Sequence, residues 1–206
     1  MPIRRKDIVP LSEELIANIS DSVDAHVEKV TSFLKDDDWS LVIKLHALVE
    51  AAVTQLIVSK TDIAMKSVIE RLPLSDNSIG KGRMALDMSL ITESQFRFLR
   101  KFSELRNELV HKVGNVDFNL KKYVDSFDSN QRKAWKAMLA WSAPGYPSSD
   151  VSDDDLLHPR MGLYSSVLRL VMLMAVEEQL ALIAQKVLEL SDRTERELWP
   201  RDDGRP

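Results

Sequence analysis

An arginine, an amide and an imidazole lie close together near the end of one amphipathic segment, residues 93 to about 113. On a helical wheel at about 100° per residue, Asn107 and His111 are four residues apart and share the polar side, with Ser103 nearby. Arg106 falls instead on the edge that should be buried. Because a buried guanidinium needs a charged partner, the sequence predicts a carboxylate or an anionic ligand beside Arg106.

A second pair of polar side chains lies beside the apolar stripe of an earlier helical segment, residues 39–59. His46 and Glu50 are four residues apart and therefore share one side of that helix. Glu50 is the first candidate for the partner of Arg106, which would make a purely structural ion pair with His46 as a satisfied boundary residue. The His-Glu-x-x-His spacing of a zinc site is absent and no third ligand is evident, so we expect neither a metal nor another cofactor.

The six residues 106–111 read RNELVH and match the Arg-x4-His signature of the HEPN superfamily, a group of small all-helical domains. The motif lies near the end of a long helix, and an earlier helix carries the letters LHALVE at residues 45–50. Over roughly residues 38–120, with LPL at 72–74 and a glycine-containing loop, the layout resembles the mannitol operon repressor branch of these proteins.

The resemblance implies a bundle that dimerises across the motif helix and, in catalytic members, a metal-independent endoribonuclease. In that chemistry the 2′-hydroxyl of RNA attacks its neighbouring phosphate and leaves a cyclic phosphate end. His111 would be the general acid or base, Arg106 would stabilise charge on the phosphorane, and Asn107 would orient His111 or the phosphate. Arg106 and His111 point about 140° apart on an ideal helix, so a two-fold dimer would be needed to gather both around one phosphate.

Two functions are open at this point. The first is a dimeric HEPN-type ribonuclease in a toxin or defence setting, with RNA as substrate and an antitoxin or regulatory protein as partner. The second is a non-enzymatic regulator or interaction module resembling the mannitol operon repressor. Toxins of this kind often carry a tyrosine two residues after the histidine, where it can be adenylylated, but Val113 occupies that position here. The sequence therefore gives no support to control by adenylylation.

The elements that position these residues are all expected to be helices, because apolar residues recur three and four positions apart in nearly every long segment. The predicted fold is an all-α antiparallel bundle with a long C-terminal helix. Its helices are expected at residues 12–34, 39–59, 61–71, from 83 onward, 93–113, 119–127, 129–141 and 160–190. Residues 1–11 are expected to form an N-terminal tail, 12–191 the bundle domain, 142–159 an exposed loop within it, and 192–206 a charged C-terminal tail.

Composition limits the function classes further. The chain has no cysteine, which excludes disulfides, thiolate catalysis and zinc sites built on sulfur. The formal net charge is -4, but residues 80–136 carry twelve Lys or Arg against seven Asp or Glu, a local +5 that leaves -9 for the rest. A polyanion such as RNA would prefer this middle region, and ordinary unevenness of a mixed-sign surface is the alternative.

The sequence predicts neither export nor membrane insertion. Arg4, Arg5 and Lys6 are not followed by the apolar region that a secretory signal needs. The apolar stretch at 167–184 contains charged residues that would be costly in a bilayer, so it is interpreted as a packing helix. We therefore expect a cytoplasmic protein with no membrane partner.

Overall fold

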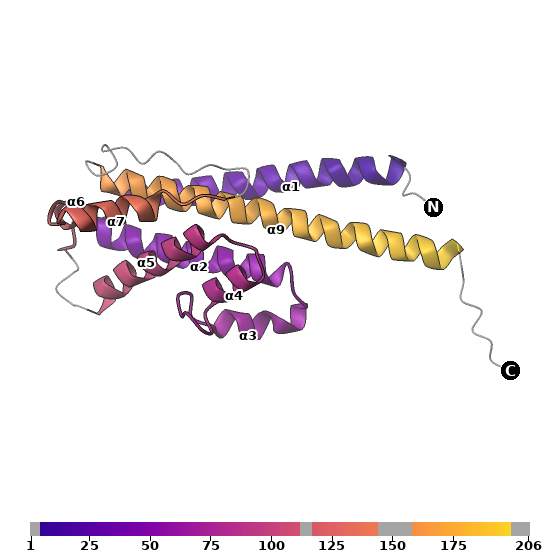
Figure 1. Ribbon diagram of the computed structural model, residues 1–206. Coiled ribbons are helices and arrows are strands. Elements are labelled where there is room, and N and C mark those ends of the chain that lie inside the picture. Colours follow the sequence, from indigo (N-terminus) through magenta and orange to yellow (C-terminus); the bar gives the residue numbers. More distant parts are fainter. Residues whose placement is uncertain (1–4, 112–116, 144–157, 199–206) are drawn as a thin grey trace.

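The computed structural model describes residues 5–111, 117–143 and 158–198 of the 206-residue chain (Figure 1). The regular elements of these residues are helices, and the predicted all-α fold with a long C-terminal helix is confirmed. In chain order they are α1 (Arg5–Ser32), α2 (Asp38–Val58), α3 (Lys66–Arg71), α4 (Lys81–Asp87), α5 (Glu93–Val110), α6 (Leu120–Asp125), α7 (Ser129–Leu139) and α9 (Pro159–Leu198), with 3-10 turns η1 (Phe33–Lys35) and η2 (Ile63–Met65).

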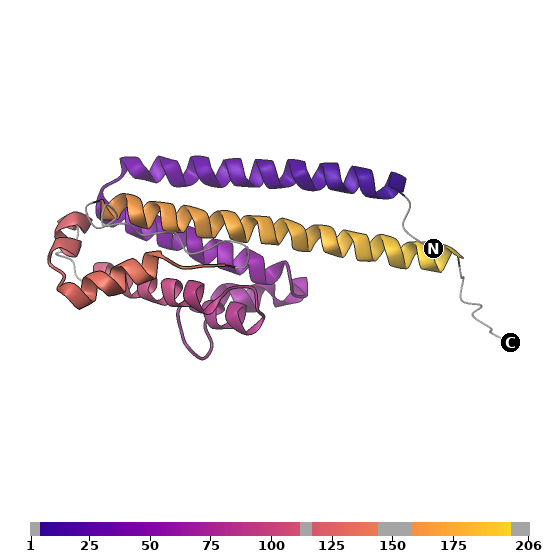
Figure 2. The ribbon, with the colours of Figure 1, turned by 45° about the horizontal axis from the view of Figure 1, so that its top comes forward.

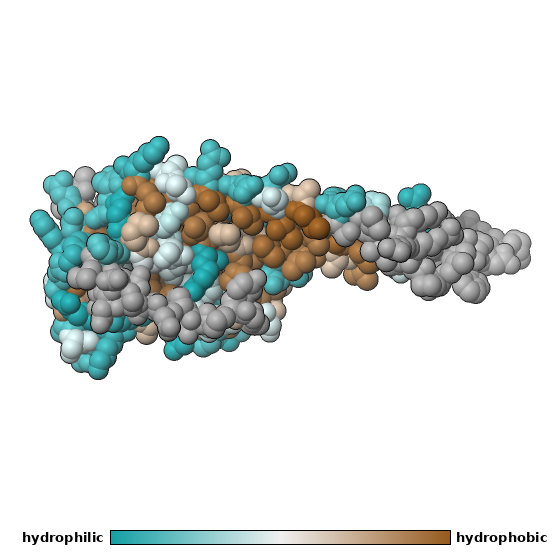
Figure 3. All heavy atoms as spheres, turned by 90° about the horizontal axis from the view of Figure 1, so that it is seen from above, coloured by the Kyte–Doolittle hydropathy of each residue, from teal (hydrophilic) through white to brown (hydrophobic). Residues whose placement is uncertain are grey.

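The two longest helices, α1 and α9, lie side by side and antiparallel, and together they extend beyond the other helices (Figures 1 and 2). Helix α2 packs between this pair and the shorter helices, with contacts to α9, α4 and α5, while α7 packs against α5. Seen from above, hydrophobic side chains gather along α1 and α9 (Figure 3). The motif helix α5 is therefore on the opposite side of α2 from the long helical pair.

Helix α2 forms the centre of the core. Its buried residues are Leu41, Val42, Leu45, His46, Val49, Ala52, Val53, Leu56 and Ile57. By length and composition alone, it is the one helix of the described chain that could cross a membrane. Half of that apolar segment is buried against other helices, which is typical of the core helix of a folded domain.

The two ends of the bundle differ from the sequence prediction. Helix α1 begins at Arg5 and contains Pro10, so the predicted N-terminal tail at 1–11 is wrong from Arg5 onward. Helix α9 continues to Leu198, so the predicted C-terminal tail at 192–206 is wrong as far as that residue. The segment 191–198 contains two Glu and two Arg, which are good helix formers, so its charged composition does not end the helix. Most of the predicted loop at 142–159 lies outside the described residues.

Candidate functional site

Helix α5 is fixed at both ends, and this determines where the motif residues lie. At its start Thr92 and Gln95 form a capping box: the Thr92 hydroxyl accepts from the Gln95 amide at 3.2 Å, and the Gln95 side chain accepts from the Thr92 amide at 2.8 Å. At its end the Trp39 indole of α2 donates to the Leu109 carbonyl at 3.5 Å. The start of α2 thus meets the end of α5, and the two helices are antiparallel.

Arg106 is half-buried, as its position on the wheel predicts, but its partner is not the predicted one. Its Nη1 donates to the Oδ1 of Asn107 at 3.0 Å, and within the described part of the chain no carboxylate forms an ion pair with it. Asn107 therefore holds the guanidinium, rather than the imidazole of His111. A half-buried cation whose partner is a neutral amide keeps the capacity to bind an anion.

The predicted pairing of Glu50 with Arg106 is wrong. The Oε1 of Glu50 accepts from the Nζ of Lys81 at 2.9 Å, and the side chain of Lys81 is only 4% exposed. The reason is the antiparallel register: His46 lies opposite Ser103, so Glu50 lies opposite residues earlier in α5. Glu50 lies about one turn from His46 in one direction, and Arg106 lies about one turn from Ser103 in the other. Glu50 and Arg106 are therefore roughly 10 Å apart along the helix axes.

His46 is buried and hydrogen-bonded, so it is a satisfied core residue. Its Nε2 lies 3.0 Å from the Oγ of Ser103, and its ring packs at 5.6 Å, centroid to centroid, from Phe102. The expectation that Ser103 shares the polar side with Asn107 is wrong, because Ser103 is 3% exposed and faces α2. Burial, helped by the charge of Arg106, lowers the pKa of His46 to about 4, against a smaller opposing effect of Glu50.

The lowered pKa of His46 predicts a loss of stability in mild acid. In the unfolded chain the histidine takes up a proton with a pKa of about 6.5, whereas in the folded chain it stays neutral until the pH nears 4. The free energy of unfolding is therefore highest above pH 6.5 and falls as the pH drops from 6.5 toward 4. Between pH 7.5 and 4.5 we expect the free energy of unfolding to drop by about 2.5 kcal/mol through this residue. Urea unfolding followed by circular dichroism measures it.

The matched control for this titration is His46→Gln, which retains a hydrogen-bonding side chain opposite Ser103 but has no proton to gain. Carboxylates titrate equally in both proteins, so the difference between wild type and variant isolates His46. If that difference is the same at pH 7.5 and pH 4.5, the burial of a neutral imidazole at His46 does not cause the loss of stability in mild acid.

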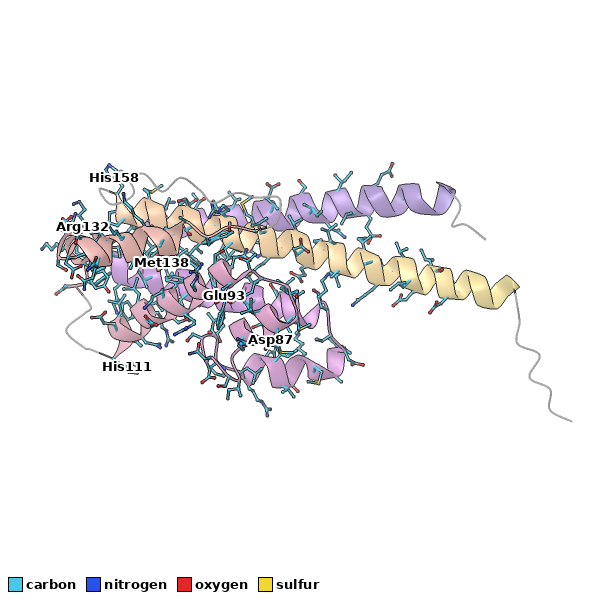
Figure 4. All side chains as sticks on the ribbon, viewed as in Figure 1. Asp87, Glu93, His111, Arg132, Met138 and His158 are labelled. Atoms are coloured by element: carbon cyan, nitrogen blue, oxygen red, sulfur yellow. The ribbon has the colours of Figure 1, made fainter. Side chains whose placement is uncertain are left out.

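His111 lies where α5 ends, and its side chain is exposed. Its backbone amide donates to the carbonyl of Asn107 at 3.2 Å and so closes the last turn of the helix. Figure 4 shows the imidazole on the outside of the molecule, at the C-terminal end of α5. The structure therefore brings Arg106 and Asn107 together and leaves His111 accessible on another side of the same helix.

The described residues contain no group of three or more His, Asp or Glu that could hold a metal ion. They do contain two features that sequence reasoning missed. One is the buried cation Lys81, which lies between two glycines in a short helix where no apolar pattern marks burial. The other is a row of rings on the α6–α7 side of α5, formed by Phe118, Tyr123, Phe127 and Trp135, with successive centroids 5.4, 4.9 and 6.0 Å apart. The four-residue spacing of Tyr123 and Phe127 was the available signal.

The chain matches no protein-family model, no curated protein and no solved structure. The residues of α5 and their surroundings therefore carry the candidate function.

Proposed function

We propose that this protein is a dimeric, metal-independent endoribonuclease of the HEPN type that acts in the cytoplasm, in a toxin or defence setting. The observation that carries the proposal is Arg106: a half-buried guanidinium, held by the neutral amide of Asn107, with no carboxylate partner in the described chain. Such a group is suited to bind a phosphate. An accessible imidazole, His111, follows about 1.4 turns later on the same helix.

The proposed reaction needs one base, one acid and one site of positive charge. The imidazole takes the proton from the 2′-hydroxyl as the 2′-oxygen attacks phosphorus. The imidazolium so formed gives that proton to the 5′-oxygen as its bond to phosphorus breaks, which leaves a 2′,3′-cyclic phosphate and a 5′-hydroxyl. His111 performs the proton transfer, and Arg106 stabilises the charge on the equatorial phosphorane oxygens. Because the two side chains project about 140° apart, each phosphate would receive Arg106 and His111 from different protomers of a two-fold dimer.

Cleavage of a mixed RNA pool in the presence of a chelator tests the proposal. We expect the wild type to cut and to leave cyclic phosphate ends, and His111→Ala to lose about two to four orders of magnitude in rate with an unchanged circular dichroism spectrum. The matched control is His158→Ala, which removes an exposed histidine beside the start of α9, labelled in Figure 4. It is expected to cut like the wild type.

Two outcomes would end the ribonuclease proposal. One is an intact RNA pool with the wild-type protein, and the other is a cleavage rate that His111→Ala leaves unchanged. In either case the non-enzymatic regulator becomes the better hypothesis, with α5 serving dimer contacts. Sedimentation of the same wild-type sample measures the assembly that the two-fold site requires.

A further inference from the structure

A small aromatic cavity lies beside the motif, between α5 and the α6–α7 segment. Its volume is about 240 Å³, and its walls include Lys101, Glu104 and Glu108 from α5 and Tyr123, Phe127 and Trp135 from the other side. Pockets for drug-sized ligands have volumes of about 300–1,000 Å³, so this cavity suits a smaller group. Its combination of ring faces and carboxylates is suited to a flat ligand with N–H donors.

The α5 wall of the cavity leads directly to His111. Lys101, Glu104, Glu108 and His111 follow one another at intervals of three, four and three residues, which places all four on one face of the helix. Arg106 is about 140° from His111 around the same helix and does not belong to this face. A group bound in the cavity would therefore lie next to the imidazole.

The two carboxylates of the cavity each accept a hydrogen bond from a side chain of the same lining. The Lys101 ammonium donates to Glu104 at 2.7 Å, and the Tyr123 hydroxyl donates to Glu108 at 3.3 Å. A carboxylate offers about four lone-pair positions, so both acids keep the capacity to accept further hydrogen bonds.

The protonation state of Tyr123 keeps its hydrogen bond to Glu108 in place. Burial, together with the charges of Glu108 and Glu104, raises the pKa of Tyr123 to about 12. The hydroxyl therefore stays protonated at any physiological pH and remains a donor to Glu108. The side chain is fixed with its ring beside the cavity, at 4.9 Å and nearly edge-on to Phe127.

We propose that this cavity is a nucleobase subsite that holds one unstacked base of a single-stranded RNA, with guanine preferred. Proteins read single-stranded RNA by stacking splayed bases on aromatic rings and hydrogen-bonding their Watson–Crick edges. Guanine presents adjacent N–H donors on that edge, which match the carboxylates of Glu104 and Glu108. Uracil presents one N–H donor on that edge, flanked by carbonyl oxygens that the same carboxylates repel.

The inference rests on the proposed ribonuclease function, because it assigns the base beside the phosphate that His111 would act on. The cavity carries two carboxylates against the one ammonium of Lys101, and this net negative charge disfavours a phosphate. The backbone therefore stays outside it, near the exposed His111, while the base enters. Stacking on aromatic rings tolerates any base, so the carboxylates supply the discrimination.

Binding of four fluorescent RNA oligonucleotides tests the subsite. They consist of uridines except for one central base, which is G, A, C or U, and every ribose carries 2′-fluorine, so attack by a 2′-hydroxyl cannot occur. Fluorescence anisotropy with the wild-type protein is expected to give roughly tenfold tighter binding of the G oligonucleotide than of the all-uridine one. Glu104→Gln and Glu108→Gln are each expected to remove most of that preference.

Glu189→Gln is the matched control, since it removes one exposed carboxylate from α9, outside the cavity, and should leave the preference intact. Equal binding of the four oligonucleotides by the wild type, no binding of any of them, or a preference that survives both cavity variants would overturn the subsite. These outcomes are separate from failure of the ribonuclease proposal. RNA that is cut without base preference overturns the subsite alone, whereas guanine-selective binding without cutting overturns the enzyme alone.

Discussion

An equimolar mixture of Arg106→Ala and His111→Ala protomers is expected to regain RNA cleavage that neither variant has alone. Each variant by itself lacks one of the two groups at both sites of a two-fold dimer, so we expect each to lose about two to four orders of magnitude in rate. In a mixed dimer, one site combines Arg106 of one protomer with His111 of the other. Random subunit exchange makes half of the dimers mixed, each with one intact site, so about a quarter of the wild-type rate should return.

The control for this complementation is a mixture of His111→Ala with the double variant Arg106→Ala/His111→Ala, which contains no histidine at either site and must stay inactive. Both mixtures are first unfolded together and refolded, or incubated until sedimentation of differently labelled protomers shows exchange. If the mixture of single variants stays inactive after exchange, each phosphate takes both groups from one chain. A monomer in sedimentation would exclude the shared site altogether.

The fold could be predicted because its signals are local. Apolar residues three and four positions apart identify a helix without reference to its neighbours, and the starts of α2 and α5 follow recognisable caps. At α2, Asp37 accepts from the amide and the hydroxyl of Ser40 at 2.9 and 2.6 Å, and these bonds lower its pKa. The start of α1 and the end of α9 were mispredicted because a serine followed by acidic residues, as at Ser12, and the charged residues near 192 indicate helix boundaries only on average.

The candidate site was predictable in part. The wheel of α5 gives the angular position of Arg106, and the structure confirms its partial burial. The wheel does not give the register of α2 against α5. That register pairs His46 with Ser103 and places Glu50 away from Arg106. The aromatic cavity depends on how α6 and α7 fold back against α5, which no pattern within one segment reveals.

Removing Glu50 from its ion pair with Lys81 is expected to lower the free energy of unfolding much more than removing Lys81. Both residues line a cavity of about 730 Å³ between α2, the η2–α3 segment and α9, but the side chain of Lys81 is only 4% exposed whereas that of Glu50 is 37% exposed. Glu50→Ala strands a buried cation, and we expect it to lower the free energy of unfolding by about 3–5 kcal/mol. Lys81→Met leaves a carboxylate that water can reach and replaces the stem with an apolar one of similar length, so its cost should be below about 1 kcal/mol.

Chemical unfolding at one fixed protein concentration, followed by circular dichroism, measures both effects. The matched control is Glu70→Ala, which breaks an ion pair with Lys66 at 4.0 Å whose two side chains are 56% and 52% exposed. A surface pair of this kind contributes about 0–1 kcal/mol, so Glu70→Ala should be nearly neutral. The asymmetry is the decisive quantity, because a simple loss of attraction would cost the same whichever partner is removed. If Lys81→Met destabilises the protein as much as Glu50→Ala does, the cost lies in the lost contact rather than in a stranded buried charge.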